Sequence, residues 1–269
     1  MRPPFRAGPQ RISYAPVITF SLQSGSNGNA IYVEAGDVRL LFDAGISARL
    51  AETRMKVHGR SLQGCDALII SHNHSDHVKG AGTIHRRFRM PIYLTESVYQ
   101  AIRPQLGLLR ETGRFVPGDT LTFRDVKVHT ILTPHDGIDT VCFVIEHDGR
   151  RLGIFTDLGH PFPALREALS VIDAAYLESN YDPDMLRISP YSDFLKRRIT
   201  GDGGHISNDE AADLSKTCVN PRIKWLAVAH LSECNNRPEL AVDAQRRLVG
   251  ESFPVRVASR YEAGELLEV

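Results

Sequence analysis

The sequence contains no apolar run near the roughly 20 residues that a membrane-spanning helix needs. Its four cysteines are scattered without a CxxC pair, so neither a disulfide framework nor a cysteine-rich zinc motif is indicated. The 32 basic and 32 acidic residues cancel, which argues against a protein surrounded by positive potential but leaves room for local basic patches. The proline- and arginine-rich N-terminus lacks the apolar core of a signal peptide. We therefore expect a cytoplasmic protein with no membrane partner.

Apolar segments separated by Gly, Asn and Asp predict strands and helices in both halves of the chain. Strands are expected at 17–22, 30–35, 38–42, 67–70, 91–94, 174–177, 225–229 and 255–258, with a β-rich region over 120–155. Helices are expected at 48–58, 78–88, 96–106, 164–169, 183–188, 193–199, 207–218 and 238–248. This alternation, without repeats or low-complexity linkers, favours an α/β fold with two sheets packed face to face and helices outside. We expect one domain over residues 16–269 after a flexible tail, residues 1–15.

Three imidazoles and a carboxylate gather in the segment His72-Asn-His-Ser-Asp-His77, which follows the apolar residues 67–70. Histidine nitrogens and carboxylate oxygens are ligands that zinc and similar divalent ions prefer. Six neighbouring residues cannot surround two metals, and His135, Asp157 and His230 each come just after an apolar strand. Alone, these two histidines would often be core or loop residues and the aspartate a turn residue. Their order and strand-end positions favour ligands.

This pattern, HxHxDH followed by His, Asp and His, resembles the metallo-β-lactamase superfamily, whose fold is an αββα sandwich. The resemblance implies a site for two metals, with a metal-bridging hydroxide as nucleophile. One metal would be held by His72, His74 and His135, the other by Asp76, His77 and His230, with Asp157 bridging them. Asp43 matches the family's early strand-end aspartate, which orients the ligand loop. Asp76 is also expected to be a catalytic residue. The cofactors expected are two divalent ions, with zinc the first choice and manganese or iron as alternatives.

Further polar segments suggest how a substrate is held. The glycine-rich segment 24–29, with Ser26 and Asn29, can offer backbone N–H groups to an anion, or be an ordinary turn. His205 and Ser207 precede a helix with a capping box, where the free N–H groups favour a phosphate. His205 can also donate a proton to a leaving oxygen, and Ser207 can be only a cap. Asn180, after a buried strand, is a candidate for lining the cleft.

Six segments together are similar to the YycJ/WalJ-type branch of the superfamily, and the similarity runs from about residue 18 to the C-terminus. They are SGSNGN, SHNHSDHVKG, TDLGH, LESNYD, GDGGHISNDEAADL and AHLSECNNRPELA. The branch implies a 5′→3′ DNA exonuclease without an inserted cap domain. One departure is Asn73, at a non-ligand position where the branch often has Glu.

The resulting hypothesis is a two-metal phosphodiesterase acting on nucleic acid, DNA in preference to RNA. The alternatives are a small-molecule phosphodiesterase or thioesterase on the same site, and a non-catalytic metal-binding regulator. Two basic runs, residues 85–89 and 196–198, can follow a nucleic-acid backbone or be solvated helix faces. No aromatic stacking platform is evident. The sequence leaves open the metal, strand preference, exonuclease versus endonuclease action, and the oligomeric state.

Overall fold

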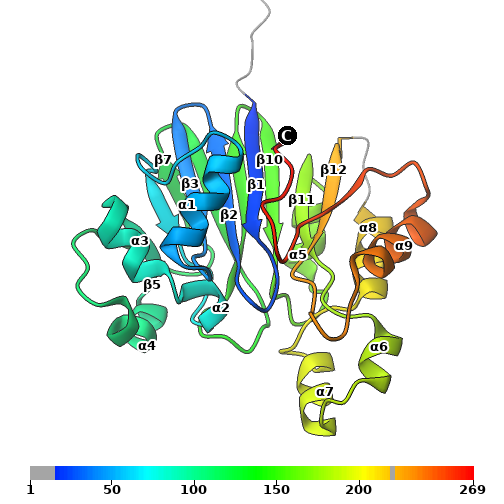
Figure 1. Cartoon of the computed structure of the whole chain (residues 1–269). Coiled ribbons are helices and arrows are strands. Elements are labelled where there is room, and N and C mark those ends of the chain that lie inside the picture. Colours follow the sequence, from blue (N-terminus) through cyan, green and yellow to red (C-terminus); the bar gives the residue numbers. More distant parts are fainter. Residues whose placement is uncertain (1–15, 219–221) are drawn as a thin grey trace, which may run out of the picture.

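The computed structural model describes residues 16–218 and 222–269; the predicted tail, residues 1–15, lies outside them. Within the described residues, strands form two sheets of seven strands each (Figure 1). The first has the order β14 (Leu267–Glu268), β1 (Val17–Gln23), β2 (Ala30–Ala35), β3 (Val38–Phe42), β4 (Ala67–Ile69), β5 (Ile92–Thr95), β6 (Thr112–Phe115). The second has the order β13 (Val255–Val257), β12 (Trp225–Ala229), β11 (Ala174–Glu178), β10 (Arg150–Phe155), β9 (Val141–His147), β8 (Val126–Leu132), β7 (Thr120–Phe123).

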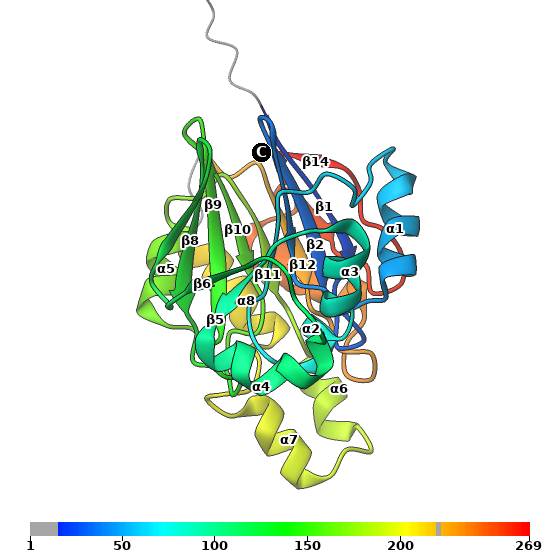
Figure 2. The same ribbon diagram turned by 90° about the vertical axis from the view of Figure 1, so that its left-hand side faces the viewer.

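Helices cover the outer face of each sheet (Figure 2). On the first sheet these are α1 (Ala48–Val57), α3 (Ala81–Phe88) and α4 (Glu96–Leu106), and on the second α5 (Pro163–Leu169), α8 (Asn208–Cys218) and α9 (Pro238–Val249). Three further helices, α2 (Ser75–Val78), α6 (Pro183–Ile188) and α7 (Asp193–Thr200), lie toward one end of the sandwich. This is the predicted αββα sandwich. No helix in the described part of the chain is long and apolar enough to span a membrane.

Alternating side chains on the strands fill the layers on both faces of each sheet. In β3, Leu40 and Phe42 point into the layer between the sheets, whereas Leu41 packs with the helices outside. Across that inner layer, the ring of Phe42 lies 5.0 Å from the ring of Phe143 on β9. In central strands such as β4, β11 and β12 every residue is buried, so these strands are almost continuously apolar in sequence.

Strand directions place many strand ends at one edge of the sandwich. Strands β3, β4, β5 and β6 run parallel to one another, as do β10, β11, β12 and β13. Strand β8 is antiparallel to β9, which is antiparallel to β10, so β8 and β10 run the same way. By the same reasoning β1 runs with β3. The residues that follow β1, β3 and β4 therefore share one edge of their sheet, and those after β8, β10, β11 and β12 share one edge of theirs.

The structure corrects the sequence prediction in three places. The helix predicted over 78–88 begins later, at Ala81, because Val78 ends α2 and the two helices are separated at Gly80. The Gly80 N–H donates to the carbonyl of Ala44 (2.8 Å), and a Cβ at Gly80 would lie 1.9 Å from the carbonyl oxygen of Ile46. This close contact fixes the break. Strands β6 and β14 were not predicted; the short β14 is held by pairing with β1 (Ile18 opposite Glu268).

Candidate metal centre

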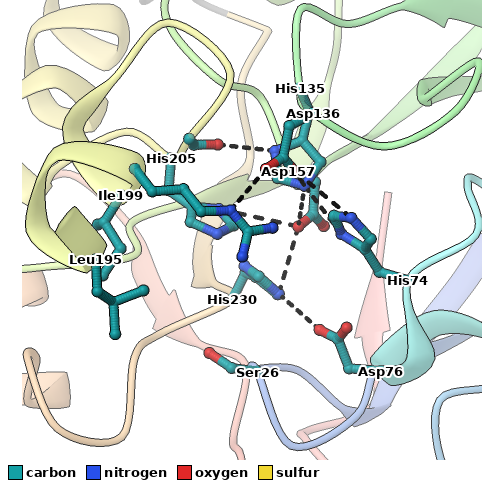
Figure 3. Close-up of a pocket in the computed structure, with 12 residues that line it drawn as sticks. Ser26, His74, Asp76, His135, Asp136, Asp157, Leu195, Ile199, His205 and His230 are labelled. Atoms are coloured by element: carbon teal, nitrogen blue, oxygen red, sulfur yellow. Dashed lines mark hydrogen bonds and ion pairs between the residues drawn. The ribbon is translucent and has the colours of Figure 1, made fainter.

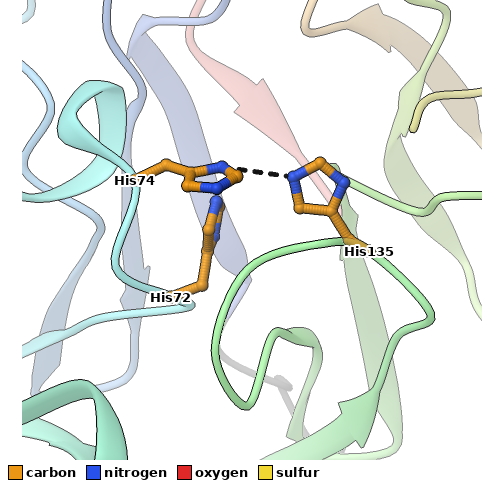
Figure 4. A group of neighbouring side chains, drawn as sticks. All are labelled: His72, His74 and His135. Carbon is orange, nitrogen blue, oxygen red and sulfur yellow. Dashed lines mark hydrogen bonds between the residues drawn. The ribbon is translucent and has the colours of Figure 1, made fainter. Parts of the chain in front are cut away.

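The seven predicted metal ligands converge at the shared edge of the sandwich. His72 and His74 follow β4, Asp76 and His77 lie in α2, and the later three follow β8, β10 and β12. Donor atoms of His72, His74 and His135 lie within 4.8 Å of one another (Figure 4), and so do those of Asp76, His77 and His230. These are the two groups of three that the family resemblance implies.

Asp157 lies between the two groups. Its Oδ2 is 3.2 Å from His77 Nε2, and its Oδ1 is 3.6 Å from both His135 Nε2 and His230 Nε2. With His72 and His77 it forms a further group of donor atoms within 4.8 Å. A single buried carboxylate thus reaches both groups, which is the position that a bridging ligand needs.

The donor set fits divalent metal ions. His72 is fully buried, its Nδ1 is 2.9 Å from Ser71 Oγ, and its Nε2 has no hydrogen-bond partner among the residues that the structure describes. Burying such a polar atom unpaired costs about 1–3 kcal/mol, which coordination to a cation would offset. His135 Nδ1–H donates to the carbonyl of Gly204 (2.8 Å), which leaves its Nε2 lone pair toward Asp157. An outer hydrogen bond that fixes the tautomer in this way is typical of metal-binding histidines.

Asp43 holds the segment 71–77, which carries four of the proposed ligands, in place through hydrogen bonds. Its Oδ1 accepts hydrogen bonds from the Ser71 N–H (2.8 Å) and the Ser71 hydroxyl (3.0 Å). Its Oδ2 accepts from His77 Nδ1 (2.8 Å), so His77 Nε2 is directed at Asp157. These contacts match the orienting role that the resemblance implies for Asp43.

Three of the strand-end residues adopt the left-handed backbone conformation: Asp43 (φ 60°), Asp157 (φ 57°) and His230 (φ 54°). Asp and His tolerate this region better than most residues, but each still costs on the order of 1–3 kcal/mol. Hydrogen bonds hold two of them in place. The Asp43 N–H donates to the carbonyl of Ile69 (2.9 Å), and the His230 N–H donates to Ser24 Oγ (2.9 Å). The sharp turns at these three residues direct their side chains over the ends of the strands, where the proposed ligands gather.

The charges of the site are arranged around Asp157. Burial and the neighbouring His77 hold the pKa of His72 well below its ordinary value. Burial also disfavours the charged form of His230, but Asp157, Asp76 and Glu178 raise its pKa to about 10. Despite burial, His230 and His77 in turn hold the pKa of Asp157 well below its usual range. A bound divalent cation would replace the positive charge of the protonated histidines around Asp157. Metal ions and protons therefore compete for the same side chains.

An open cavity of about 190 Å³ lies over the ligands. Its lining, much of it visible in Figure 3, consists of Ser26, His74, Asp76, His135, Asp136, Asp157, Leu195, Arg198, Ile199, Gly204, His205 and His230. Of the residues predicted to bind substrate, the cavity therefore includes Ser26 and His205.

Asn29, Asn180 and Ser207 are not part of that lining. The Asn29 side chain donates to Asp76 Oδ2 (3.3 Å), and the Asn180 side chain donates to the carbonyl of His230 (2.9 Å). Ser207 caps α8: its hydroxyl accepts from the Glu210 N–H, and its own N–H donates to the Glu210 carboxylate. Asn29 and Asn180 thus hold proposed ligands from outside the cavity, and the contact of all three residues with substrate stays a prediction.

Sequence reasoning missed two charged residues of the site, Glu178 and Asp136. Glu178, fully buried, accepts from His205 Nδ1 (2.7 Å) and lies 3.3 Å from His230 Nδ1. Asp136 forms part of the cavity wall, where it pairs at 2.8 Å with Arg198 of the predicted basic run 196–198. The sequence signal for Glu178 is its place at the start of the polar segment 178–182, which follows a buried strand and also contains Asn180.

The chain resembles known proteins in sequence and in fold. A sequence model described as the Beta-lactamase superfamily domain matches residues 38–226. The chain belongs to the metallo-β-lactamase superfamily. It is 33% identical over 243 residues to "Exodeoxyribonuclease YycJ" of Bacillus anthracis, covering 87% of this chain and 92% of that protein. It is 32% identical over 224 residues to "Exodeoxyribonuclease WalJ" of Streptococcus pneumoniae, covering 82% and 83%.

A solved structure of the metallo-β-lactamase fold, YhfI from Bacillus subtilis, has the same architecture. It superposes with a TM-score of 0.74 at 18% identity, covering 95% of this chain and all (100%) of that one. The predicted family, its YycJ-type branch and the αββα fold are therefore confirmed. As a member of this branch of the metallo-β-lactamase superfamily, the protein is a metal-dependent hydrolase.

Proposed function

We propose that this protein is a nuclease that hydrolyses phosphodiester bonds of DNA from a 5′ end, with two divalent metal ions bound. One observation carries the proposal: two groups of metal-binding side chains share Asp157 on the floor of an open cavity. Relatives that match over most of their length are named exodeoxyribonucleases, which supports DNA as the substrate.

One ion would be held by His72, His74 and His135, and the other by Asp76, His77 and His230, with Asp157 reaching both. Bound divalent ions activate water as a nucleophile at neutral pH and polarise the phosphoryl group under attack. Zinc suits this mixed set of nitrogen and oxygen ligands, and manganese or iron can replace it.

His205 is proposed to assist the leaving group. Its ring lies in the cavity wall, and Glu178 holds its Nδ1 at 2.7 Å. Nε2 is then the ring atom free to deliver a proton to a leaving oxygen or to bind a phosphate. Ser26, exposed on the opposite loop of the same cavity, is proposed to contact the substrate as well.

The decisive experiment incubates the protein with end-labelled single- and double-stranded DNA and RNA, with zinc, manganese and iron(II) in turn. Mononucleotides released from the 5′ end are expected. The His72→Ala and His74→Ala double variant should lose this activity while its circular dichroism spectrum stays unchanged. His129→Ala, a partly exposed histidine on β8, is the matched control. Full nuclease activity in the double variant would refute the assignment.

A small-molecule phosphodiesterase or thioesterase is the second candidate, because a cavity of about 190 Å³ by itself accommodates only a small ester. The two functions differ in salt dependence. Binding of a nucleic-acid strand weakens steeply with added salt, because the phosphates release counterions. Turnover of small esters that is insensitive to salt, without cleavage of any oligonucleotide, would favour this second function.

A further inference from the structure

Helices α6 and α7 project from the sandwich at the end that carries the metal centre (Figures 1 and 2). None of the 8 residues of α7 is buried, and in α6 only Leu186 is. The segment nevertheless carries large apolar side chains in contact with water: Ile188 is 74% exposed and Phe194 is 73% exposed. Core packing therefore does not explain why α7 has this sequence.

One face of α7 is part of the cavity wall. Leu195, Arg198 and Ile199, spaced three and four residues apart, all line it. Arg198 Nε donates to Asp136 Oδ2 at 2.8 Å. The other oxygen of Asp136 lies 3.4 Å from His74 Nε2. The guanidinium is thus one residue away from the proposed metal ligands, with 56% of its side chain still exposed.

Phe194 lies one helical turn before Arg198, on the same side of α7. Scattered exposed apolar residues are common and need no explanation. An exposed aromatic ring one helical turn from a cation of the cavity wall is a different case, because such a pair can stack on a base and bind the neighbouring phosphate.

The other basic run of the sequence is placed differently. Residues 85–89 belong to the end of α3, on the outer face of the first sheet, and the cavity lining includes none of them. Of the two runs, only 196–198 contributes a residue to the cavity.

We propose that α7 binds an unpaired strand as it enters the metal centre, with Arg198 on a backbone phosphate and Phe194 stacked on the adjacent base. This rests on the proposed nuclease function and defines its substrate as a single-stranded end. Inside a duplex both faces of a base are covered by its neighbours, so a protruding ring needs an unstacked base. On binding, the phosphate replaces Asp136 as the partner of the Arg198 guanidinium, an exchange of one anion for another.

The stacking contact is tested by Phe194→Leu and Phe194→Trp, with Ile188→Ala as the control at an equally exposed apolar position of the same segment. The measurement is KM and kcat for a 5′-phosphorylated single-stranded 12-mer, and kcat/KM for bis(p-nitrophenyl) phosphate. Phe194→Leu should raise KM for the 12-mer about 5- to 160-fold, the range for loss of one stacked base. The ratio of its kcat/KM for the 12-mer to that for the small diester should fall accordingly. Phe194→Trp and Ile188→Ala should stay near the wild-type values.

The phosphate contact is tested by Arg198→Gln, with Arg87→Gln on α3 as the control. Affinity for a fluorescein-labelled, phosphorothioate-linked 12-mer is measured from 50 to 300 mM salt. Arg198→Gln should reduce the slope of log affinity against log salt by about 0.7, the value for one phosphate of a single strand. Arg87→Gln should leave the slope unchanged.

The outcomes distinguish failure of the proposed nuclease function from failure of the role proposed for α7. If the wild-type protein cleaves no nucleic acid, the proposed function fails. If the wild type cleaves DNA but Phe194→Leu and Arg198→Gln match it in KM and salt slope, α7 is not the strand-binding element. Equal losses on blunt duplex and on single-stranded substrate would overturn the claim that the bound strand is unpaired.

Discussion

Replacing Glu178 by glutamine should weaken metal binding although Glu178 is not one of the proposed ligands. The two oxygens of the Glu178 carboxylate contact different groups. Oε1 faces the Nδ1 atoms of His205 (2.7 Å) and His230 (3.3 Å). Oε2 accepts from the backbone N–H groups of Leu158 (3.0 Å) and Ile206 (3.4 Å). Four nitrogens thus surround one buried anion, whose pKa is lowered, against the effect of burial, mainly by His205 to about 2.

Glutamine has the same shape but only one oxygen. If its NH₂ group faced the backbone, it would meet two N–H donors, so its oxygen should stay there and its NH₂ should face the histidines. That group would donate to His230 Nδ1 and move the ring proton to Nε2, the atom that faces Asp76 and Asp157. A protonated Nε2 cannot bind a metal. Loss of such an outer partner typically costs about 10- to 100-fold in metal affinity, or about 1.4–2.7 kcal/mol.

The measurement is titration calorimetry of the metal-free protein with zinc in a competing chelator. The control is Glu96→Gln, which removes an exposed carboxylate on α4 paired with Arg114. Glu178→Gln should bind zinc about 10- to 100-fold more weakly, whereas the control should bind as the wild type does. Wild-type zinc affinity in a folded Glu178→Gln variant would refute the tautomer argument.

Three further predictions follow from the packing, the thiols and the ligands. A Cβ at Gly45 would lie 1.5 Å from the carbonyl oxygen of Asp76, so Gly45→Ala should lower the free energy of unfolding by at least ~1–3 kcal/mol in urea titrations. Iodoacetamide at pH 8 should modify only the exposed Cys234 in the native protein, because burial shields the other cysteines and raises the pKa of Cys65 to about 12; mass spectrometry counts the adducts. Chelation should lower the thermal midpoint, since a metal present at a thousandfold its dissociation constant stabilises by about 4 kcal/mol.

Features that depend on local sequence could be predicted. The strands at 30–35, 38–42 and 225–229 lie where the apolar runs indicated. The capping box at Ser207 starts α8 as expected, because its hydrogen bonds join residues only three apart. The grouping of ligands was also predicted, but through the resemblance to a family; the residues alone indicated only that a metal binds.

Features that depend on contacts between distant segments could not be predicted. Arg198 pairs with Asp136, which lies 62 positions away, and nothing near either residue indicates the pair. The role of Glu178 depends on the neighbours that β10, β12 and the loop before α8 bring to it. Nothing in the sequence near Phe194 indicates that its side chain is 73% exposed. Its proposed role depends on α7, whose residues Leu195, Arg198 and Ile199 line the cavity.

The distribution of ligands over the chain has a structural reason. Each group of three takes two side chains from the segment after β4 in the first sheet and one from a strand end of the second, His135 or His230. Asp157, also from the second sheet, lies against both groups. A metal in either group would therefore link the two sheets at the edge where their shared apolar layer ends. Each metal would take two ligands that are close together in sequence from the first sheet and one ligand from the second. The sequence accordingly has one dense motif, residues 72–77, followed by single ligands far along the chain.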